Sequence, residues 1–352
     1  MPNWAASMQQ TFEYYIVDPW TWKDTKLLDT VKSCTIKRDS DSETLGSATI
    51  DISESVGECY IRAYLVTIQN GIREKHPLGT FLVQTPSSSF DGKIRDISMD
   101  SYTPLIELKE GMPPLGYSIP KGSNIMELSY LLTREHARAP VVKASSTSTL
   151  FNDFIADIND TWLSFITDLL ANAKYTYDLD EMGRIIFSPK QDTASLQPVW
   201  TYNADDDSIL YPELNMDHDL YGIPNIVEVI YSNGNGHYYS RVVNDDSNSP
   251  TSTVNRGREI IYRVTDPDLI GDPTNSQIDK YAEQLLRELS SVEYTITYTH
   301  GYCPVRVGDC IRFNYSRAGL KDIKAKVISQ SIKCELGCPV TEKAVYTKNL
   351  WR

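Results

Sequence analysis

SATIDIS, residues 47–53, alternates apolar and polar side chains, and this pattern decides the fold class. Ala48, Ile50 and Ile52 fall on one face of an extended strand, because successive side chains of a strand point to opposite faces. The neighbouring runs are also β-prone, and they end in Asp, Pro, Ser or Asn-Gly turn signals: residues 11–20, 27–40, 59–72, 77–86 and 93–108. Short strands with regular turns predict a first tube-like β-barrel domain over residues 1–110.

The middle of the chain, residues 111–215, changes character and predicts a linker with a small α/β insert. A Pro/Gly-rich joint at 111–122 precedes a helix that Asn124 can cap. The clearest helix covers about residues 160–173, because its large apolar side chains recur at i, i+3, i+4, i+7 and i+8: Trp162, Phe165, Ile166, Leu169 and Leu170. A hairpin over 174–189 should turn at Glu181-Met182-Gly183.

Strand patterns return after the insert and predict a second tube-like β-barrel domain over residues 216–352. This domain should also contain a helix from about Ser276 to Ser290, with Ser276 and Asp279 at capping spacing. A long terminal hairpin over 311–332 should turn near Gly319. The fold class is therefore mainly β with an α+β insert. The order barrel, insert, barrel suggests an internal duplication.

The composition restricts the classes of partner. The formal net charge is −13, and an acidic chain repels phosphate, so ordinary nucleic-acid binding is not expected. Such a chain suits a channel through which DNA passes only in transit. The first fifteen residues lack the basic start and apolar run of a signal peptide, and no long apolar stretch occurs. We therefore expect folding in the cytoplasm and no membrane insertion by this chain.

Candidate catalytic groups do not assemble into a pattern. The five histidines are scattered, and nucleophile elbows, phosphate-binding loops and dinucleotide fingerprints do not occur. Asp178, Asp180 and Glu181 could imitate a glycosidase acid pair, but they fit a tight turn beside Gly183 better. Asp205, Asp206 and Asp207, with Asp217 and Asp219, lack calcium-loop spacing and are expected to be solvated. We expect no enzyme activity.

Cysteines give the one pointed signal for a bound group. Cys303, Cys310, Cys334 and Cys338 cluster near the terminal hairpin, and folding that hairpin back would bring Cys310 towards Cys334 and Cys303 towards Cys338. Four thiols could hold zinc or an iron–sulfur cluster, form two disulfides, or remain buried thiols. The spacings are not those of a zinc ribbon, and no cofactor is certain. Cys34 and Cys59 lie in strand-like runs and suit buried positions.

Several segments in a fixed order resemble the hub proteins of long-tailed phages. They are His300–Cys310, Ser249–Ile260, the TWLSFITDLL helix at 161–170, the closing KCELGCPVTEKAVYTKNLW at 333–351 and, in the first half, LGSATIDIS, PLGTFLVQTPSS and Asp100. The resemblance covers nearly the whole chain. The chain also resembles the hub module of VgrG-type secretion spikes.

The resemblance implies a homotrimer in which each subunit supplies two tube-like barrels, so that three subunits match a sixfold tail tube to a threefold tip. It also implies a place in the virion, at the tail tip or baseplate, after assembly in the host cytoplasm. Expected partners are tail tube and distal tail proteins, a spike or fibre protein, and the tape measure protein. The alternative is a peripheral receptor- or carbohydrate-binding tail protein, or the hub of a related injection or secretion machine.

Overall fold

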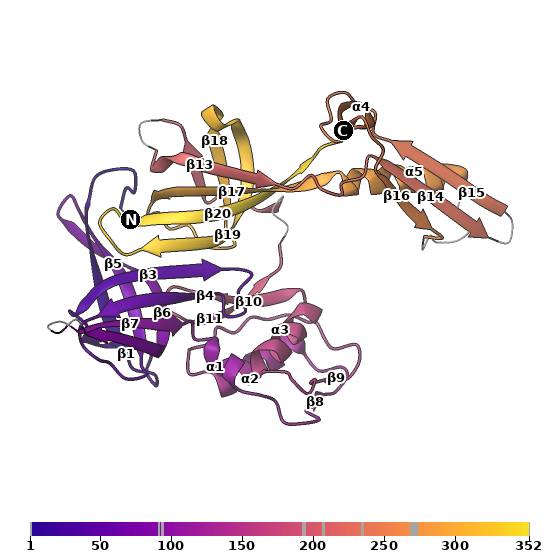
Figure 1. The fold of residues 1–352 in the computed structure, drawn as a ribbon. Helices are drawn as coiled ribbons and strands as arrows, with labels where there is room; N and C mark the ends of the chain where they lie inside the picture. Colours follow the sequence, from indigo (N-terminus) through magenta and orange to yellow (C-terminus); the bar gives the residue numbers. More distant parts are fainter. Residues whose placement is uncertain are drawn as a thin grey trace. The chain divides into compact units, whose positions relative to one another are not determined.

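The alternating segment at residues 47–53 lies in β4, a central strand of the first β-module (Figure 1). The computed structural model describes residues 2–90, 92, 95–191, 195–205, 208–233, 236–267 and 274–351. Ala48, Ile50 and Ile52 are buried, as the alternation predicts. The module consists of β1 (Gln9–Val17), β2 (Asp24–Leu27), β3 (Val31–Asp39), β4 (Gly46–Ile52), β5 (Tyr60–Gln69), β6 (Ile72–Phe90) and β7 (Arg95–Tyr102).

Strand β5 is buried on both faces from Tyr60 to Thr67, because each face packs against a different apolar core. Tyr60 packs with the helices of the insert. Its neighbour Ile61 points the other way, into the core between the strands. The strand therefore reads as a continuous apolar run rather than an alternation, as expected for a strand covered on both sides.

The insert contains α1 (Ile106–Glu110), β8 (Ser118–Ile119), α2 (Ile125–His136), β9 (Phe154–Ile155), α3 (Trp162–Asn172) and the hairpin of β10 (Tyr175–Leu179) with β11 (Ile185–Pro189). Asn124 caps α2, accepting a hydrogen bond of 2.9 Å from the Glu127 amide. A capping box between Thr161 and Ser164 starts α3. The five apolar side chains predicted to share one face of α3 are all buried.

The second β-module comprises β12 (Trp200–Asn203), β13 (Leu210–His218), β17 (Ser291–Gly301), β18 (Cys310–Tyr315), β19 (Leu320–Lys333) and β20 (Pro339–Asn349), with a short 3-10 turn, η2 (Ser316–Ala318), between β18 and β19. The predicted hairpin is confirmed as β18 and β19. Cys310, however, lies opposite Lys326 and not near Cys334, because β19 is much longer than β18. The far end of β19 pairs with β3 instead.

One sheet of 13 strands therefore runs through both β-modules, in the order β13-β17-β20-β19-β3-β4-β7-β6-β5-β1-β2, with β12 and β18 off this path. The two modules meet where residues 35–39 of β3 pair antiparallel with residues 329–333 of β19. We call this pairing the β3–β19 seam. The mainly β fold with a small helical insert is confirmed, whereas closure of each module into a tube stays a prediction.

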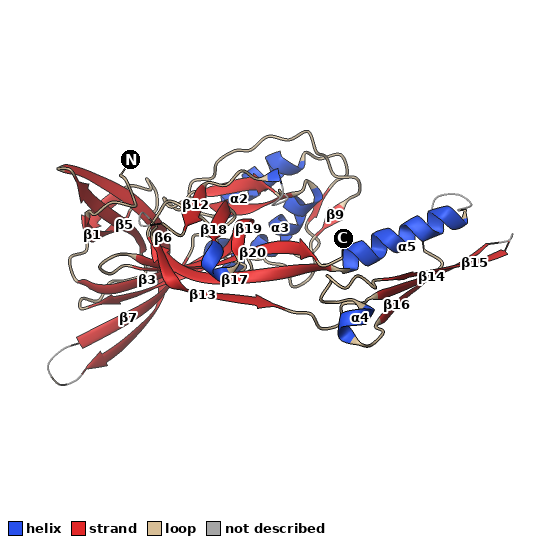
Figure 2. Ribbon diagram, turned by 90° about the horizontal axis from the view of Figure 1, so that it is seen from above, coloured by secondary structure: helices blue, strands red, loops and turns tan. Residues whose placement is uncertain are grey.

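The chain divides into two compact units, and the division differs from the predicted second barrel at 216–352. Unit 1 comprises residues 1–214 and 298–344, and unit 2 comprises residues 215–297 and 345–352. Within unit 2, the separate sheet β15 (Gly236–Val243)–β14 (Ile226–Asn233)–β16 (Ile261–Thr265) is covered on one face by α5 (Asn275–Leu289) (Figure 2). This unit also contains α4 (Thr253–Arg256). Because α5 and the β15–β14–β16 sheet form an apolar core together, these strands are not part of the 13-stranded sheet.

The helix at the end of unit 2 was predicted with the wrong cap. Thr274 is the N-terminal cap of α5, and it forms a capping box with Gln277. Ser276 already lies inside the helix. Serine and threonine are both preferred at this position, so a cap assigned from residue type alone can fall two residues off. Within the described ranges, no helix is long and apolar enough to cross a membrane.

Candidate functional site

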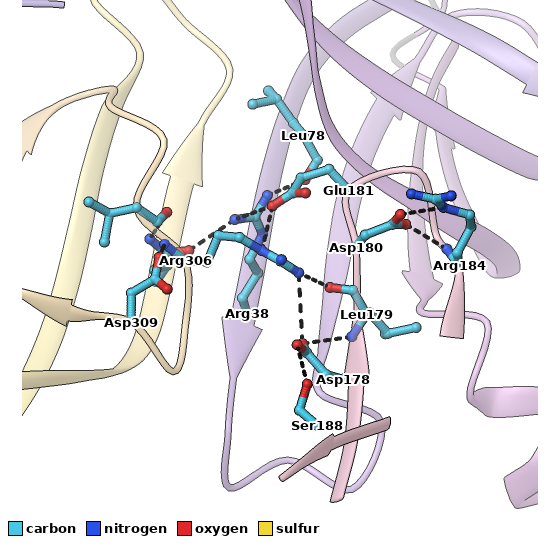
Figure 3. A network of polar contacts seen from close by, with 12 residues as sticks. Arg38, Leu78, Asp178, Leu179, Asp180, Glu181, Arg184, Ser188, Arg306 and Asp309 are labelled. Carbon is cyan, nitrogen blue, oxygen red and sulfur yellow. Dashed lines mark hydrogen bonds and ion pairs between the residues drawn. The ribbon is translucent and has the colours of Figure 1, made fainter. Parts of the chain in front are cut away.

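A cavity of about 640 Å³ lies in unit 1 where the two β-modules and the insert meet. Strands β3 and β6 line it from the first module, the β10–β11 hairpin from the insert, and residues 306–310 from the second module. Charged side chains from all three parts converge beside this cavity (Figure 3). Segments far apart in sequence therefore meet at this cavity.

Glu181, in the turn of the hairpin, is the shared acceptor of this network. Its carboxylate Oε1 lies 2.8 Å from Nε of Arg306 and 3.7 Å from Nη1 of Arg38. Arg306 also donates to the carbonyl of Leu179 and lies 3.7 Å from Asp178. One carboxylate of the insert therefore joins an arginine from each β-module.

Arg38 is further fixed by groups on either side of the β3–β19 seam. Its Nη2 donates to the carbonyl of Leu78 at 2.6 Å, and its Nη1 donates to Oε1 of Gln330 at 3.1 Å. A guanidinium with several fixed acceptors is well suited to set the relative position of three segments, because its donors lie in a rigid plane.

The backbone of the same turn binds the first module. The carbonyl of Met182 accepts hydrogen bonds from Nε1 of Trp22 at 2.7 Å and from Nη2 of Arg62 at 3.0 Å. Gly183 has φ +72°, and a Cβ there would lie 2.7 Å from Cβ of Thr80. The turn needs glycine both for its left-handed backbone and for this close approach.

The carboxylates that could have imitated a glycosidase pair are engaged in structural contacts. Asp180 accepts hydrogen bonds from the amide and Nε of Arg184, at 2.8 and 2.5 Å. Asp178 accepts from Ser188 at 3.2 Å and from the Leu179 amide at 2.8 Å. These acidic residues lie in and beside the turn, as predicted, and Glu181 also contacts an arginine from each β-module, so the arrangement can hold the modules together.

A second polar cluster lies inside the second β-module. Nε2 of His300 is 3.2 Å from Oε1 of Glu342, and neither side chain is exposed. Nδ1 of His300 lies 2.6 Å from the carbonyl of Gly301. Glu342 also accepts hydrogen bonds from Tyr298 and Gln330. Because both ring nitrogens of His300 face acceptors, the ring can hold two protons and form a buried ion pair.

The two charges stabilise each other. Burial lowers the pKa of His300, but its contacts with Cys303 and with the carboxylate of Glu342 outweigh burial and raise the pKa to about 10. Burial raises the pKa of Glu342, but His300 outweighs this effect, so the pKa of Glu342 falls below its usual value. Gln330 touches both Glu342 and Arg38, and it links this cluster to the network at the cavity.

The structure places the four predicted metal ligands in different surroundings. Sγ of Cys303 lies 3.6 Å from Oη of Tyr202, inside the polar cluster. Cys310 begins β18, while Cys334 and Cys338 share an apolar core with Cys34. In the part of the chain that the structure describes, no three His, Cys, Asp or Glu side chains are grouped to hold a metal ion. The predicted zinc or iron–sulfur site does not fit this arrangement.

The acidic run near residue 205 was expected to be solvated. Asp205 and Asp219 are exposed, as is Asp217. Asp206 and Asp207 lie outside the described residues.

Sequence reasoning missed both polar networks, although a signal for them exists. Cys34 and Ile36 are buried, and Arg38 follows in the same phase of β3. His300 follows buried Ile296 and Tyr298 in β17, and Glu342 stands between buried Val340 and Ala344 in β20. A charged residue in the apolar phase of a strand must find a buried partner, and this pattern indicates such positions.

Comparisons with known proteins identify the fold. No family model matches this chain, and no curated protein does. Among solved structures, a tail protein from Neisseria meningitidis MC58 matches 97% of this chain and 98% of its own, with a TM-score of 0.59 and 13% identity. The 43 kDa tail protein of prophage MuSo2 from Shewanella oneidensis matches 96% of this chain and 98% of its own, with a TM-score of 0.60 and 10% identity.

A Francisella PdpA-VgrG complex also contains a similar chain. The match covers 98% of this chain and 53% of that chain, with a TM-score of 0.52 and 8% identity. The protein therefore has the fold of solved phage and prophage tail proteins, and this fold also occurs in a VgrG-containing complex. At these identities the likeness shows the fold alone.

Proposed function

We propose that this chain is a structural, non-enzymatic subunit of a phage tail or a related injection machine, acting as the hub at the tail tip. In this role three copies form a ring that matches the sixfold tail tube to a threefold tip. The domain organisation proposed for this role is two tube-like β-barrel domains, at residues 1–110 and 216–352, with the linker and insert at 111–215 between them; the sheet of the second domain also takes in β12 and the start of β13.

The observation that carries the proposal is the β3–β19 seam. It joins two β-modules edge to edge within one chain. In the proposed ring each chain would therefore supply two adjacent positions. The shared sheet begins at β13 and ends at β2. Pairing β2 of one copy with β13 of the next would cover these edges and close the ring, which is how sheet proteins avoid open edges. Full-length likeness to solved tail proteins supports the same role.

The network around Glu181 supports the proposal in a second way. A ring subunit must keep its two modules at a fixed angle, and a turn that binds both modules provides this rigidity. The net charge of −13 suits a channel through which DNA slides without binding. Tail tube and distal tail proteins, a spike or fibre protein and the tape measure protein are the proposed neighbours in the virion.

Imaging of assembled particles tests this role. We expect three copies at the tail tip, between the tube and the spike or fibre. A count of six, or a position on peripheral fibres, would contradict the hub, and the second outcome would favour the receptor-binding alternative. Density for DNA should pass through the ring in particles caught during ejection.

A matched pair of variants tests the ring-closing edge. Leu27 in β2 is 48% exposed, and Leu27→Asp should block pairing of this edge and abolish trimers and infectious particles. Ile158 in the insert is 74% exposed and lies outside the large sheet, so Ile158→Asp should assemble normally. Equal assembly of both variants would show that β2 does not close the ring.

A further inference from the structure

Two thiols face each other across the β3–β19 seam. The register pairs Ile332 with Ile36 and Lys333 with Thr35, so the next pair along the two antiparallel strands is Cys334 with Cys34. The Cys334 amide donates to the Cys34 carbonyl at 2.9 Å, which extends the pairing to this position. The two cysteines are 300 residues apart in the chain, by subtraction of their numbers.

Strand geometry places both side chains on the same face. Ile36 and Ile332 point into the apolar core between the modules, and Cys34 and Cys334 are two positions further along each strand, so they point the same way. Cys34 is buried, whereas Cys334 is partly exposed at the end of β19. Directly opposed residues of a hydrogen-bonded antiparallel pair have Cα atoms about 5.5 Å apart, which lies within the range that a disulfide requires.

We propose that Cys34 and Cys334 form a disulfide that covalently closes the β3–β19 seam when the protein meets an oxidising environment. Both thiols are free in the structure. The oxidant is a small-molecule disulfide such as oxidised glutathione. This inference rests on the seam and does not depend on the proposed hub function.

The reaction proceeds by two thiol–disulfide exchanges. The more accessible Cys334 loses a proton, and its thiolate attacks the small disulfide, releasing one thiol and leaving a mixed disulfide on Cys334. Cys34 then loses its proton and attacks the Cys334 sulfur, which releases the second thiol. The protein loses two hydrogens, and the small disulfide is reduced to two thiols.

The groups around Cys34 and Cys334 determine how readily the disulfide forms. The Tyr14 hydroxyl lies against both sulfurs, and burial beside them raises the pKa of Tyr14, so the tyrosine stays neutral. The hydrogen-bond contact with Cys334, and then burial, raise the pKa of Cys34, which disfavours its thiolate. Oxidation should therefore be slow, and it should not occur in a reducing cytoplasm.

Cys338 is the competing partner. It lies in the same apolar core, and its amide donates to the Glu335 carbonyl at 2.8 Å in the tight turn after β19. A bond between Cys334 and Cys338 would close only this short turn and would leave the seam unlinked. The two pairings therefore have different consequences and different peptide masses.

The test uses the full chain, purified under reducing conditions and incubated with oxidised glutathione. Intact mass after alkylation should show the loss of two hydrogens, with four of the six cysteines alkylated. Peptide mapping of the wild-type chain should give one cross-link, between the peptides of Cys34 and Cys334. The thermal midpoint should rise by on the order of 10 °C, because the bond closes a very long loop. The same oxidation in urea should give mixed pairings.

Two variants separate the alternatives. Cys34→Ser should abolish the cross-link and the rise in midpoint, while Cys338→Ser should retain both. A Cys334–Cys338 link in the wild-type chain, or full alkylation of all cysteines after prolonged oxidation of the native protein, would overturn the proposal. Because the mapping is done on the wild-type chain, the result does not depend on whether a variant folds.

Discussion

The buried face of α3 and the turn of the β10–β11 hairpin belong to the same insert, yet they are held by opposite means. The helix packs Trp162, Phe165 and Leu169 into an apolar core that it shares with the first β-module. The turn is held by ion pairs and hydrogen bonds that reach both modules. The helix thus gives the insert its stability, whereas the turn determines where the modules sit around it.

The largest effect should come from the helix face. Phe165 is 1% exposed and packs against Phe154, with ring centroids 4.9 Å apart. Phe165→Ala should lower the free energy of unfolding by about 3–5 kcal/mol, because it removes a large buried ring and leaves a cavity. Denaturant unfolding measures this loss. Phe151→Ala is the control, because Phe151 is 82% exposed, and it should change little. A stable Phe165 variant that fails only in assembly would show that this face is an interface.

The next largest effect concerns the ion pair between His300 and Glu342. This pair is fully buried, so its charges should contribute more to stability than the partly exposed ion pairs of the β10–β11 turn. The folded-state pKa of His300 is raised from 6.5 to about 10, so its contribution is complete below about pH 6.5 and is lost as the pH rises towards 10. The pKa of Glu342 is lowered from 4.5, so its contribution is lost as the pH falls below about 4.5.

Stability from this pair should therefore be greatest between about pH 4.5 and 6.5. Between pH 6 and pH 9.5 the wild-type chain should lose about 3–4 kcal/mol more than a His300→Asn variant does. Unfolding curves at the two pH values measure the difference. His218→Asn, at an exposed histidine, should behave like the wild type. Identical pH profiles for wild type and His300→Asn would show that the pair is not ionised.

A smaller effect is expected at the turn. Glu181→Gln keeps the shape but removes the charge that Arg38 and Arg306 share, and it should cost about 1–2 kcal/mol, because the three side chains are only partly buried. Glu213→Gln, at an exposed position of β13, is the control. If both variants unfold alike, the network does not hold the modules together.

The smallest effect is expected at Arg184, three residues after Glu181. The Arg184 side chain is 53% exposed, and its ion pair with Asp180 spans four residues. Arg184→Met should cost less than about 1 kcal/mol, because the Arg184 backbone amide still donates to Asp180. High salt should weaken the wild type by the same small amount. A larger loss would indicate that Arg184 acts through a contact beyond this pair.

The sequence predicts the elements whose patterns are local. Helix α3 and strand β4 were found from periodicity, because apolar residues mark the buried face of each. The turn at Gly183 was found because glycine favours its left-handed backbone. Each of these features depends on residues that are only a few positions apart in the sequence.

Features that depend on pairing between distant segments could not be predicted. The hairpin of β18 and β19 was recognised, but its register was not, because nothing near Cys334 indicates that the end of β19 pairs with β3. Unit 2 was assigned to the second barrel, since short strands of a separate sheet have the same alternation as strands of a large one. The partner of a buried charge such as Glu342 lies 42 residues away, at His300, and spacing alone does not identify it.

The β3–β19 seam also sets the order in which the chain can fold during synthesis. The first β-module leaves the ribosome early, but the edge of β3 stays uncovered until β19, beginning at Leu320, has been made. At about 5–20 residues per second this interval lasts on the order of 15–60 s. During that time β3 of one nascent chain can pair with β19 of a finished neighbour. Polysomes crowded with this message would therefore favour strand-exchanged dimers, and slower initiation should suppress them.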